Sequence, residues 1–353
     1  MAKCAYNAAV KLKLENNMSN IDKGDFVKVI ANIKDEIRTT QVRTMQQVNS
    51  NLIMMYFRIG KVLSENSRYG NSFIENISLE LRLEFPSVQG LSGRNLRSMK
   101  LFYEEYKEDE IWQQVAAKLP WWHNMLLIQK IKDKNVRMIY AKAAIENGWS
   151  RSTLERQIKY EYHKRIGTSA NNFEKVLPST KSELVNDTFK DPYIFDFLTL
   201  REGYKEKELE ARMVERIRDV LLELGNGWSF VGNQYKITVG KKDYLIDMLF
   251  YHLKLKCYIV VELKATEFIP EYIGKLNFYL SAVDDFVRAE TDNPSIGLVL
   301  CKSKDKFTAQ YALQKIDRAI GVSSFETNGL LPENILDQLP SEEELNLHID
   351  IKE

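Results

Sequence analysis

Two apolar segments near residue 250 each contain one acidic residue, and no other feature of the chain restricts its fold as strongly. Residues 244–251 read YLIDMLFY, and residues 257–264 read CYIVVELK. Short runs of this kind, rich in β-branched and aromatic residues, are typical of buried strands. A carboxylate in a buried strand is costly unless a positive group meets it. We therefore expect Asp247 and Glu262 to belong to a polar site.

The short link between the two segments predicts a hairpin that brings these carboxylates together. A turn at residues 254–255 places Asp247 directly opposite Glu262. The Cβ atoms of opposed residues lie about 4.5–5.5 Å apart. Lys264 shares a face with Glu262, because alternate side chains of a strand point the same way. A register shifted by one residue would instead put these side chains on opposite faces.

A further strand is expected upstream, at residues 228–239, followed by a turn at residues 240–241. This turn would bring Gln234 into the same row as Asp247. The order that follows is a helix near 272–283, an apolar strand at 295–301 and a helix near 306–320. Together with a long helix at 206–224, this order predicts a mixed sheet covered by helices.

Two carboxylates directly opposed across a ladder repel each other. They can share a proton, pair with Lys264 or bind a divalent cation. Mg²⁺ is commonly held by one or two carboxylates together with waters and phosphate oxygens. The alternative is that Asp247 and Glu262 are solvated at strand ends, with Lys264 as a surface partner.

The pattern of Asp247, fourteen residues and then Glu262-Leu263-Lys264 resembles the PD-(D/E)xK nuclease motif. Longer stretches resemble the YhcG-like nuclease family of bacteria, and the likeness runs over roughly residues 28–345. In the C-terminal half these stretches are ELE (208–210), LLELG (221–225), IDMLFYH (246–252), PEY (270–272), NPSIG (293–297) and LPS (339–341). In the N-terminal half, IG (59–60), FP (85–86), LS (91–92), NLR (95–97) and GWS (148–150) resemble the N-terminal domain of that family.

The resemblance implies a restriction-endonuclease-like domain in which Asp247 and Glu262 bind Mg²⁺ or Mn²⁺ and Lys264 is the catalytic lysine. It further implies that Glu210, on the helix before the sheet, supplies another acidic ligand, as in resolvase-like members of the superfamily. Gln234 would assist the geometry of the metal or of the attacking water.

One position departs from the family pattern. Many relatives carry Gln-x-x-x-Tyr on the helix after the catalytic strand, whereas this chain has Lys275 and Tyr279. Residues four apart share a helix face, and the resemblance implies that this face lines the path of a phosphate. The lysine either contacts that phosphate or marks a less active member of the family.

The net charge of +1 hides an uneven distribution. Residues 1–190 carry +9 and residues 191–353 carry −8, which favours contact of the N-terminal half with phosphate. Two helix starts, at Ser92 and near Ser152, suggest capped helices compatible with a helix-turn-helix; the alternative is solvated faces of a helical bundle. The basic residues that we expect to bind nucleic acid are Arg94, Arg97, Lys100, Arg151, Arg156 and Lys159.

We expect an α+β protein of two domains. The predicted parts are a flexible N-terminus (1–24), an all-α domain (25–165), a Ser- and Asn-rich linker (166–190), a nuclease-like α/β domain (191–345) and a tail (346–353). The three cysteines are far apart and form no metal-binding motif. Without an apolar run of membrane-spanning length or a signal sequence, the expected location is the cytoplasm.

The predicted function is metal-dependent hydrolysis of phosphodiesters, most readily in DNA, in recombination, repair or defence. One alternative is a nuclease fold that binds nucleic acid without turnover. Another is a defence component whose N-terminal domain binds a protein partner. The resemblance to resolvase-like relatives, which often pair, is compatible with a homodimer.

Overall fold

The computed structural model describes residues 23–67, 70–201 and 203–327, which divide into two units. The first unit extends to Ile145, and the second begins at Glu146. Most of the predicted flexible N-terminus, the predicted tail and the end of the predicted nuclease domain lie outside the described residues.

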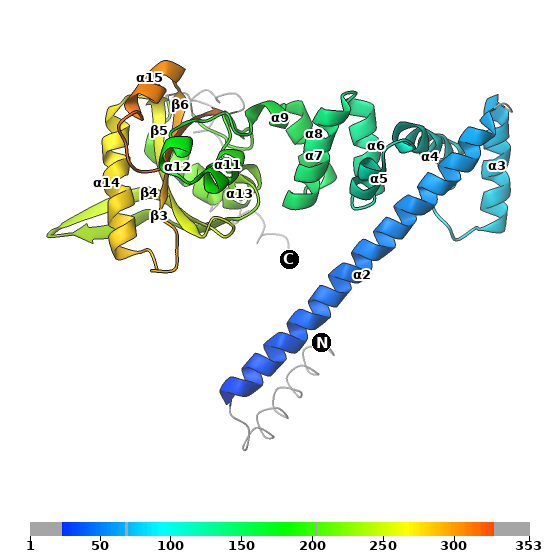
Figure 1. The fold of residues 1–353 in the computed structure, drawn as a ribbon, viewed down its shortest axis with the longest axis horizontal. Helices are drawn as coiled ribbons and strands as arrows, with labels where there is room; N and C mark the ends of the chain where they lie inside the picture. The colour runs from blue at the N-terminus through cyan, green and yellow to red at the C-terminus, as the bar shows by residue number, and fades with distance from the viewer. Residues whose placement is uncertain (1–22, 68–69, 202, 328–353) are drawn as a thin grey trace, which may run out of the picture. The chain divides into compact units, whose positions relative to one another are not determined.

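The N-terminal unit is built from helices, as predicted (Figure 1). Ser92 caps α4, because its hydroxyl accepts a hydrogen bond from the main-chain N–H of Asn95. Among the described residues, no helix is both long and apolar enough to cross a membrane. The helices are α2 (Lys23–Glu65), α3 (Gly70–Glu84), α4 (Gly93–Tyr106), α5 (Glu110–Ala116), α6 (Trp121–Lys130) and α7 (Lys134–Asn147).

The C-terminal half of α2 packs closely against α4. Ile53, Tyr56 and Leu63 are buried on this side of the helix. At Gly60 the two helices approach so closely that an added Cβ would lie 2.1 Å from the carbonyl oxygen of Met99. A side chain at this position would therefore force the helices apart.

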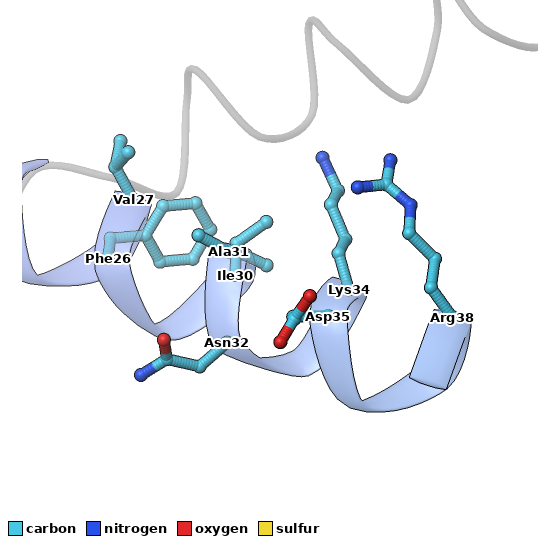
Figure 2. A pocket seen from close by; sticks show the side chains of 8 residues that line it. All are labelled: Phe26, Val27, Ile30, Ala31, Asn32, Lys34, Asp35 and Arg38. Atoms are coloured by element: carbon cyan, nitrogen blue, oxygen red, sulfur yellow. The ribbon is translucent and has the colours of Figure 1, made fainter. Parts of the chain in front are cut away.

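The N-terminal half of α2 presents apolar side chains at its surface. Val29, Ile33 and Ile37 recur at helical spacing, but each is more than half exposed. The periodicity thus predicted the helix correctly without showing which face is buried. A pocket on this part of α2 contains none of the predicted site residues (Figure 2). It is lined by Phe26, Val27, Ile30, Ala31, Asn32, Lys34, Asp35 and Arg38.

The C-terminal unit contains a seven-stranded mixed sheet in the order β1-β7-β6-β5-β4-β3, with β2 paired to β7. Strands β3, β4 and β5 are antiparallel neighbours, whereas β5, β6 and β7 run parallel. The strands are β1 (Ala170–Asn171), β2 (Tyr193–Phe195), β3 (Trp228–Val239), β4 (Lys242–His252), β5 (Cys257–Glu267), β6 (Ile296–Ser303) and β7 (Ile320–Thr327).

Helices cover both faces of this sheet (Figure 1). The side chains of α14 form one apolar cluster with the sheet, and those of α12 and α13 form another. The predicted long helix at 206–224 is two helices, because Arg216 leaves the helical conformation between them. The helices are α8 (Arg151–Lys159), α9 (Tyr162–Arg165), α10 (Phe173–Val176), α11 (Ser179–Thr188), α12 (Glu206–Glu215), α13 (Ile217–Leu224), α14 (Glu271–Phe286) and α15 (Lys306–Ala312).

The segment 166–190 is an ordered part of the C-terminal unit rather than the predicted linker. Phe173 and Phe189 are fully buried in its core. Asn172 is also buried: its side-chain oxygen accepts from the N–H of Ile320, and its amide donates to the carbonyl of Arg318. The polar composition misled the prediction, because these side chains satisfy main-chain groups inside the fold.

A buried carboxylate joins α8 and α9 to the rest of this unit. Glu223 on α13 is fully buried, and Arg165 lies 2.7 Å from its Oε1. Its Oε2 accepts hydrogen bonds from Arg156 at 3.2 Å and from Gln157 at 3.1 Å. The N–H of Ile194 donates to Oε1 as well. Both oxygens are therefore satisfied, which a buried charge requires.

We expect Glu223→Ala to lower the free energy of unfolding by about 3–5 kcal/mol, because it leaves the buried Arg165 without its counter-ion, whereas Arg156 keeps its pair with Asp196. The matched control is Glu215→Ala, which breaks an exposed pair with Arg212 and should cost less than about 1 kcal/mol. Urea unfolding of both variants measures the difference. Equal effects would show that the Glu223 network contributes little.

Candidate active site

Strands β4 and β5 pair in the predicted register and then separate next to the two acidic residues. The ladder runs from His252 with Cys257 to Met248 with Val261, where the last pair lies. Beyond it, β4 continues in pairing with β3, and β5 continues beside β6. Asp247 and Glu262 are thus the first residues beyond the last pair. We call this point the fork.

At the fork, the carboxylate of Asp247 replaces a main-chain partner. Its Oδ2 accepts a hydrogen bond of 2.9 Å from the N–H of Leu263. Burial and the nearby charge of Glu262 raise the pKa of Asp247 to about 6, against the lowering effects of that hydrogen bond and of two lysines. The Asp247 carboxylate is therefore ionised at neutral pH, although its burial and the charge of Glu262 make the ionised form less stable than in water.

Glu262 is fully buried and binds two ammonium groups through one oxygen. Its Oε1 lies 2.8 Å from Nζ of Lys264 and 2.5 Å from Nζ of Lys275. Its Oε2 is buried without a hydrogen-bond partner. We refer to Asp247, Glu262, Lys264 and Lys275 as the acid–lysine cluster. A buried carboxylate oxygen with no partner costs free energy, so Oε2 of Glu262 favours one more donor or positive group.

Both lysines of the cluster are charged. Burial opposes their ammonium forms, but the hydrogen bonds and the attraction of Glu262 outweigh it and raise the pKa of Lys264 and of Lys275. Lys264 also pairs with Glu206 at 3.2 Å. We did not predict Glu206 from the sequence, although it precedes Glu210 by one helical turn on α12 and therefore shares its face.

Glu210 and Gln234 contact each other in a group beside strand β3. Glu210 is buried, and the amides of Asn233 and Gln234 donate to its two oxygens. Gln234 has a left-handed backbone with φ of 43°, which interrupts the regular alternation of the strand. The pairs on either side of it keep the predicted register, yet its side chain meets Glu210 instead of Asp247.

Tyr279 lies one helical turn after Lys275 on α14, as predicted. Its hydroxyl donates to the main-chain carbonyl of Leu245 at 2.8 Å, which ties α14 to β4 beside the fork. The ammonium of Lys275 lies 5.3 Å from the centre of its ring. This geometry supports a positioning role for Tyr279.

The six basic residues predicted to bind nucleic acid have differing surroundings. Arg94 is exposed, whereas Arg97 pairs with Glu75, Lys100 with Glu104 and Arg151 with Glu155. Lys159 lies over the ring of Tyr160, and Arg156 belongs to the Glu223 network. The second helix begins after Ser150, whose hydroxyl caps it, and not at the predicted Ser152.

The donors at the fork suit a divalent cation. Carboxylate oxygens are the ligands that Mg²⁺ and Mn²⁺ prefer. Oε2 of Glu262 has no hydrogen-bond partner, and the charge of Glu262 is close enough to raise the pKa of Asp247. Within the described residues, no group of three or more His, Cys, Asp and Glu side chains is arranged to hold a metal. The ligand role predicted for Glu210 stays a prediction.

The raised pKa of Asp247 has a defined effect on stability. The pKa rises from 3.8 to about 6 on folding, so the folded chain binds the proton more tightly between these values. The stability that this group contributes is thus present below about pH 4 and is lost as the pH rises to 6. We expect Asp247→Asn to gain about 1–3 kcal/mol relative to the parent between pH 4 and pH 7.

Urea unfolding of the parent and the Asp247→Asn variant across this pH range tests the expectation. The control is Asp243→Asn on the same strand, because Asp243 is exposed and its hydrogen bonds to Lys236 and Thr238 lower its pKa. Parallel pH profiles for parent and Asp247→Asn would contradict the assignment.

Comparison with known proteins finds matches to both halves of the chain. Residues 186–341 match the family described as the YhcG PDDEXK nuclease domain, and residues 32–165 match the DUF1016 N-terminal domain. A relative from Escherichia coli (strain K12), YhcG, is provisionally named a nuclease; it is 29% identical over 90% of each chain. A crystal structure of a repair endonuclease from Pyrococcus abyssi matches 35% of this chain and 46% of its own, with 16% identity and a TM-score of 0.24. The chain thus joins a segment that matches the DUF1016 N-terminal domain to a segment that matches the YhcG PDDEXK nuclease domain.

Proposed function

We propose that the protein is a metal-dependent nuclease that hydrolyses phosphodiester bonds in DNA at the fork. The observation that carries the proposal is the convergence of Asp247, Glu262 and Lys264 where β4 and β5 separate. A solvated pair of strand-end acids would not explain a fully buried Glu262 or the raised pKa of Asp247.

In this proposal Asp247 and Glu262 hold one Mg²⁺ or Mn²⁺ ion. A bound ion of this kind acidifies a water and neutralises charge on the phosphate. Ionised Asp247 already accepts the N–H of Leu263 through one oxygen, which fixes the carboxylate relative to β5. Glu262 is fixed by its burial and by its ion pair with the buried Lys264.

Lys264 acts here as a fixed positive charge. Its raised pKa keeps it protonated at neutral pH, so it donates hydrogen bonds and does not accept a proton. An ammonium in this position orients the attacking water and stabilises charge that develops on the phosphate. Its contact with Glu206 and its position 5.0 Å from the ring centre of Tyr272 hold it in place.

The charge distribution favours nucleic acid as the substrate. The N-terminal 190 residues carry +9, and basic surfaces attract phosphate backbones. DNA is the substrate that we propose, with a location in the cytoplasm. Arg94 and Lys100 on α4 are the basic residues that we favour for backbone contact, because Arg94 is exposed and the pair of Lys100 with Glu104 is long, at 3.8 Å.

We expect the parent protein to cleave plasmid or branched DNA only when Mg²⁺ or Mn²⁺ is present. Asp247→Asn and Lys264→Ala should each lower the cleavage rate at least about 100-fold, because they remove a ligand and a fixed charge at the phosphate. Asp243→Asn, the same chemical change at an exposed position of β4, should leave the rate unchanged. Cleavage that persists in Asp247→Asn, with folding verified by circular dichroism, would refute the proposal.

A nuclease fold that binds DNA without turnover is the second candidate. The observation that favours it is the ion pair of Lys275 with Glu262, which already neutralises a predicted metal ligand. Salt-sensitive DNA binding without cleavage in any divalent ion would support this candidate.

The third candidate is a defence component that binds a protein partner. It draws on the exposed Val29, Ile33 and Ile37 of α2, and recovery of one protein without nucleic acid would support it.

For either DNA-binding candidate, Arg94→Ala with Lys100→Ala should weaken binding to all DNA sequences alike. Each lost phosphate contact lowers the slope of affinity against salt by about 1. Fluorescence anisotropy at several salt concentrations measures this slope. An unchanged slope would assign DNA contact to another surface of the protein.

A further inference from the structure

Lys275 occupies the position of a counter-ion for a buried carboxylate. Its ammonium lies 2.5 Å from Oε1 of Glu262, closer than the 2.8 Å of Lys264. A divalent cation held by Glu262 must therefore meet the positive charge of Lys275 at close range. Two like charges at such a distance repel strongly where burial limits screening by water.

The two lysines that bind Glu262 differ in how firmly they are held. The side chain of Lys264 is only 8% exposed and also pairs with Glu206. The side chain of Lys275 is 44% exposed on α14. An exposed lysine can move its ammonium into water at little cost, because water replaces the lost hydrogen bond. Lys275 is thus the lysine that can leave Glu262, whereas Lys264 is fixed.

The carboxylate of Glu262 is only partly satisfied by the two lysines. Both ammonium groups bind Oε1 of Glu262, while Oε2 is buried with no hydrogen-bond partner. The carboxylate of Asp247 lies close enough to Glu262 for their charges to interact, and its Oδ2 accepts from the N–H of Leu263, the residue after Glu262. The ammonium groups of Lys264 and Lys275 therefore leave one oxygen of Glu262 unsatisfied. A divalent cation can bind more of the carboxylate oxygens of Asp247 and Glu262 than a lysine does.

We propose that Lys275 is an internal competitor of the metal. In the metal-free protein it neutralises Glu262, and it gives up this carboxylate when a divalent cation binds. Lys275 thereby sets the metal concentration at which the site fills. Once released, the ammonium remains tethered to α14 at the fork, where it is available to a phosphate of the substrate. The inference deepens the proposed function and rests on its metal site.

Metal binding to the full-length protein without DNA tests this inference separately from catalysis. Mn²⁺ is the probe, and its dissociation constant is measured by isothermal titration calorimetry at pH 8. We expect Lys275→Gln to bind Mn²⁺ at least about tenfold more tightly than the parent, because the competing charge is gone. Lys275→Arg keeps the positive charge and should bind Mn²⁺ about as weakly as the parent does.

The matched control is Lys236→Gln, which removes the same charge from an exposed ion pair with Asp243 and should leave Mn²⁺ affinity unchanged. Thermal unfolding provides a second readout, since a ligand that binds only the folded state raises Tm more when its affinity is higher. The Mn²⁺-induced rise in Tm should be larger for Lys275→Gln than for the parent.

Equal or weaker Mn²⁺ binding by Lys275→Gln would overturn the inference. If Asp247→Asn still abolished binding in that case, the proposed metal site would stand without the competitor role of Lys275. Absence of binding in both the parent and Lys275→Gln would overturn the inference together with the proposed metal site. Tighter binding by Lys275→Gln without DNA cleavage would support the inference and favour the non-cleaving candidate.

Discussion

The separation of β4 from β5 after Met248 and Val261 is the constraint on which the C-terminal unit depends. Up to that pair, the main-chain groups of β4 and β5 form hydrogen bonds with each other. Beyond it, side chains must supply hydrogen-bond partners for these main-chain groups. Asp247 does so for the N–H of Leu263, and the buried Glu262 pairs with Lys275 of α14. The fork therefore brings two carboxylates close together without placing them in a regular ladder. Lysines from two different elements compensate their charge, which ties the position of α14 to the electrostatics of the strands.

The sequence predicted the sheet well because strand patterns and turns are local signals. The turn at 254–255 gave the pairing of β4 with β5, and the turn at 240–241 gave the pairing of β4 with most of β3. Side-chain direction was less predictable where the backbone departs from regular strand geometry. Gln234 has a left-handed φ and meets Glu210 instead of Asp247. Such a local irregularity has no reliable signature in the pattern of apolar residues.

The order found within residues 166–190 was not predictable for a different physical reason. Residues 166–190 are polar in composition, yet Phe173 and Phe189 enter the core and Asn172 satisfies main-chain groups of a distant strand. Composition averages over such residues and cannot show that a few of them are buried. Arg156 is a similar case: its charge suggested contact with phosphate, but it pairs with Asp196 and Glu223, 40 and 67 residues later in the chain. Ion pairs between distant residues follow from the fold and cannot be read from local spacing.

Glu223 and Glu262 show two ways in which this unit buries a carboxylate. Both are fully buried and both contact two basic side chains. Glu223 has partners on each oxygen, including a main-chain N–H, so it is complete and links α8, α9 and α13. Glu262 has partners on one oxygen only, and one of them is an exposed lysine. A saturated carboxylate has nothing to offer a ligand, whereas an unsaturated one beside a second acid favours a further cation. This difference in saturation, rather than burial or charge, distinguishes the candidate active site from the structural ion pairs around it.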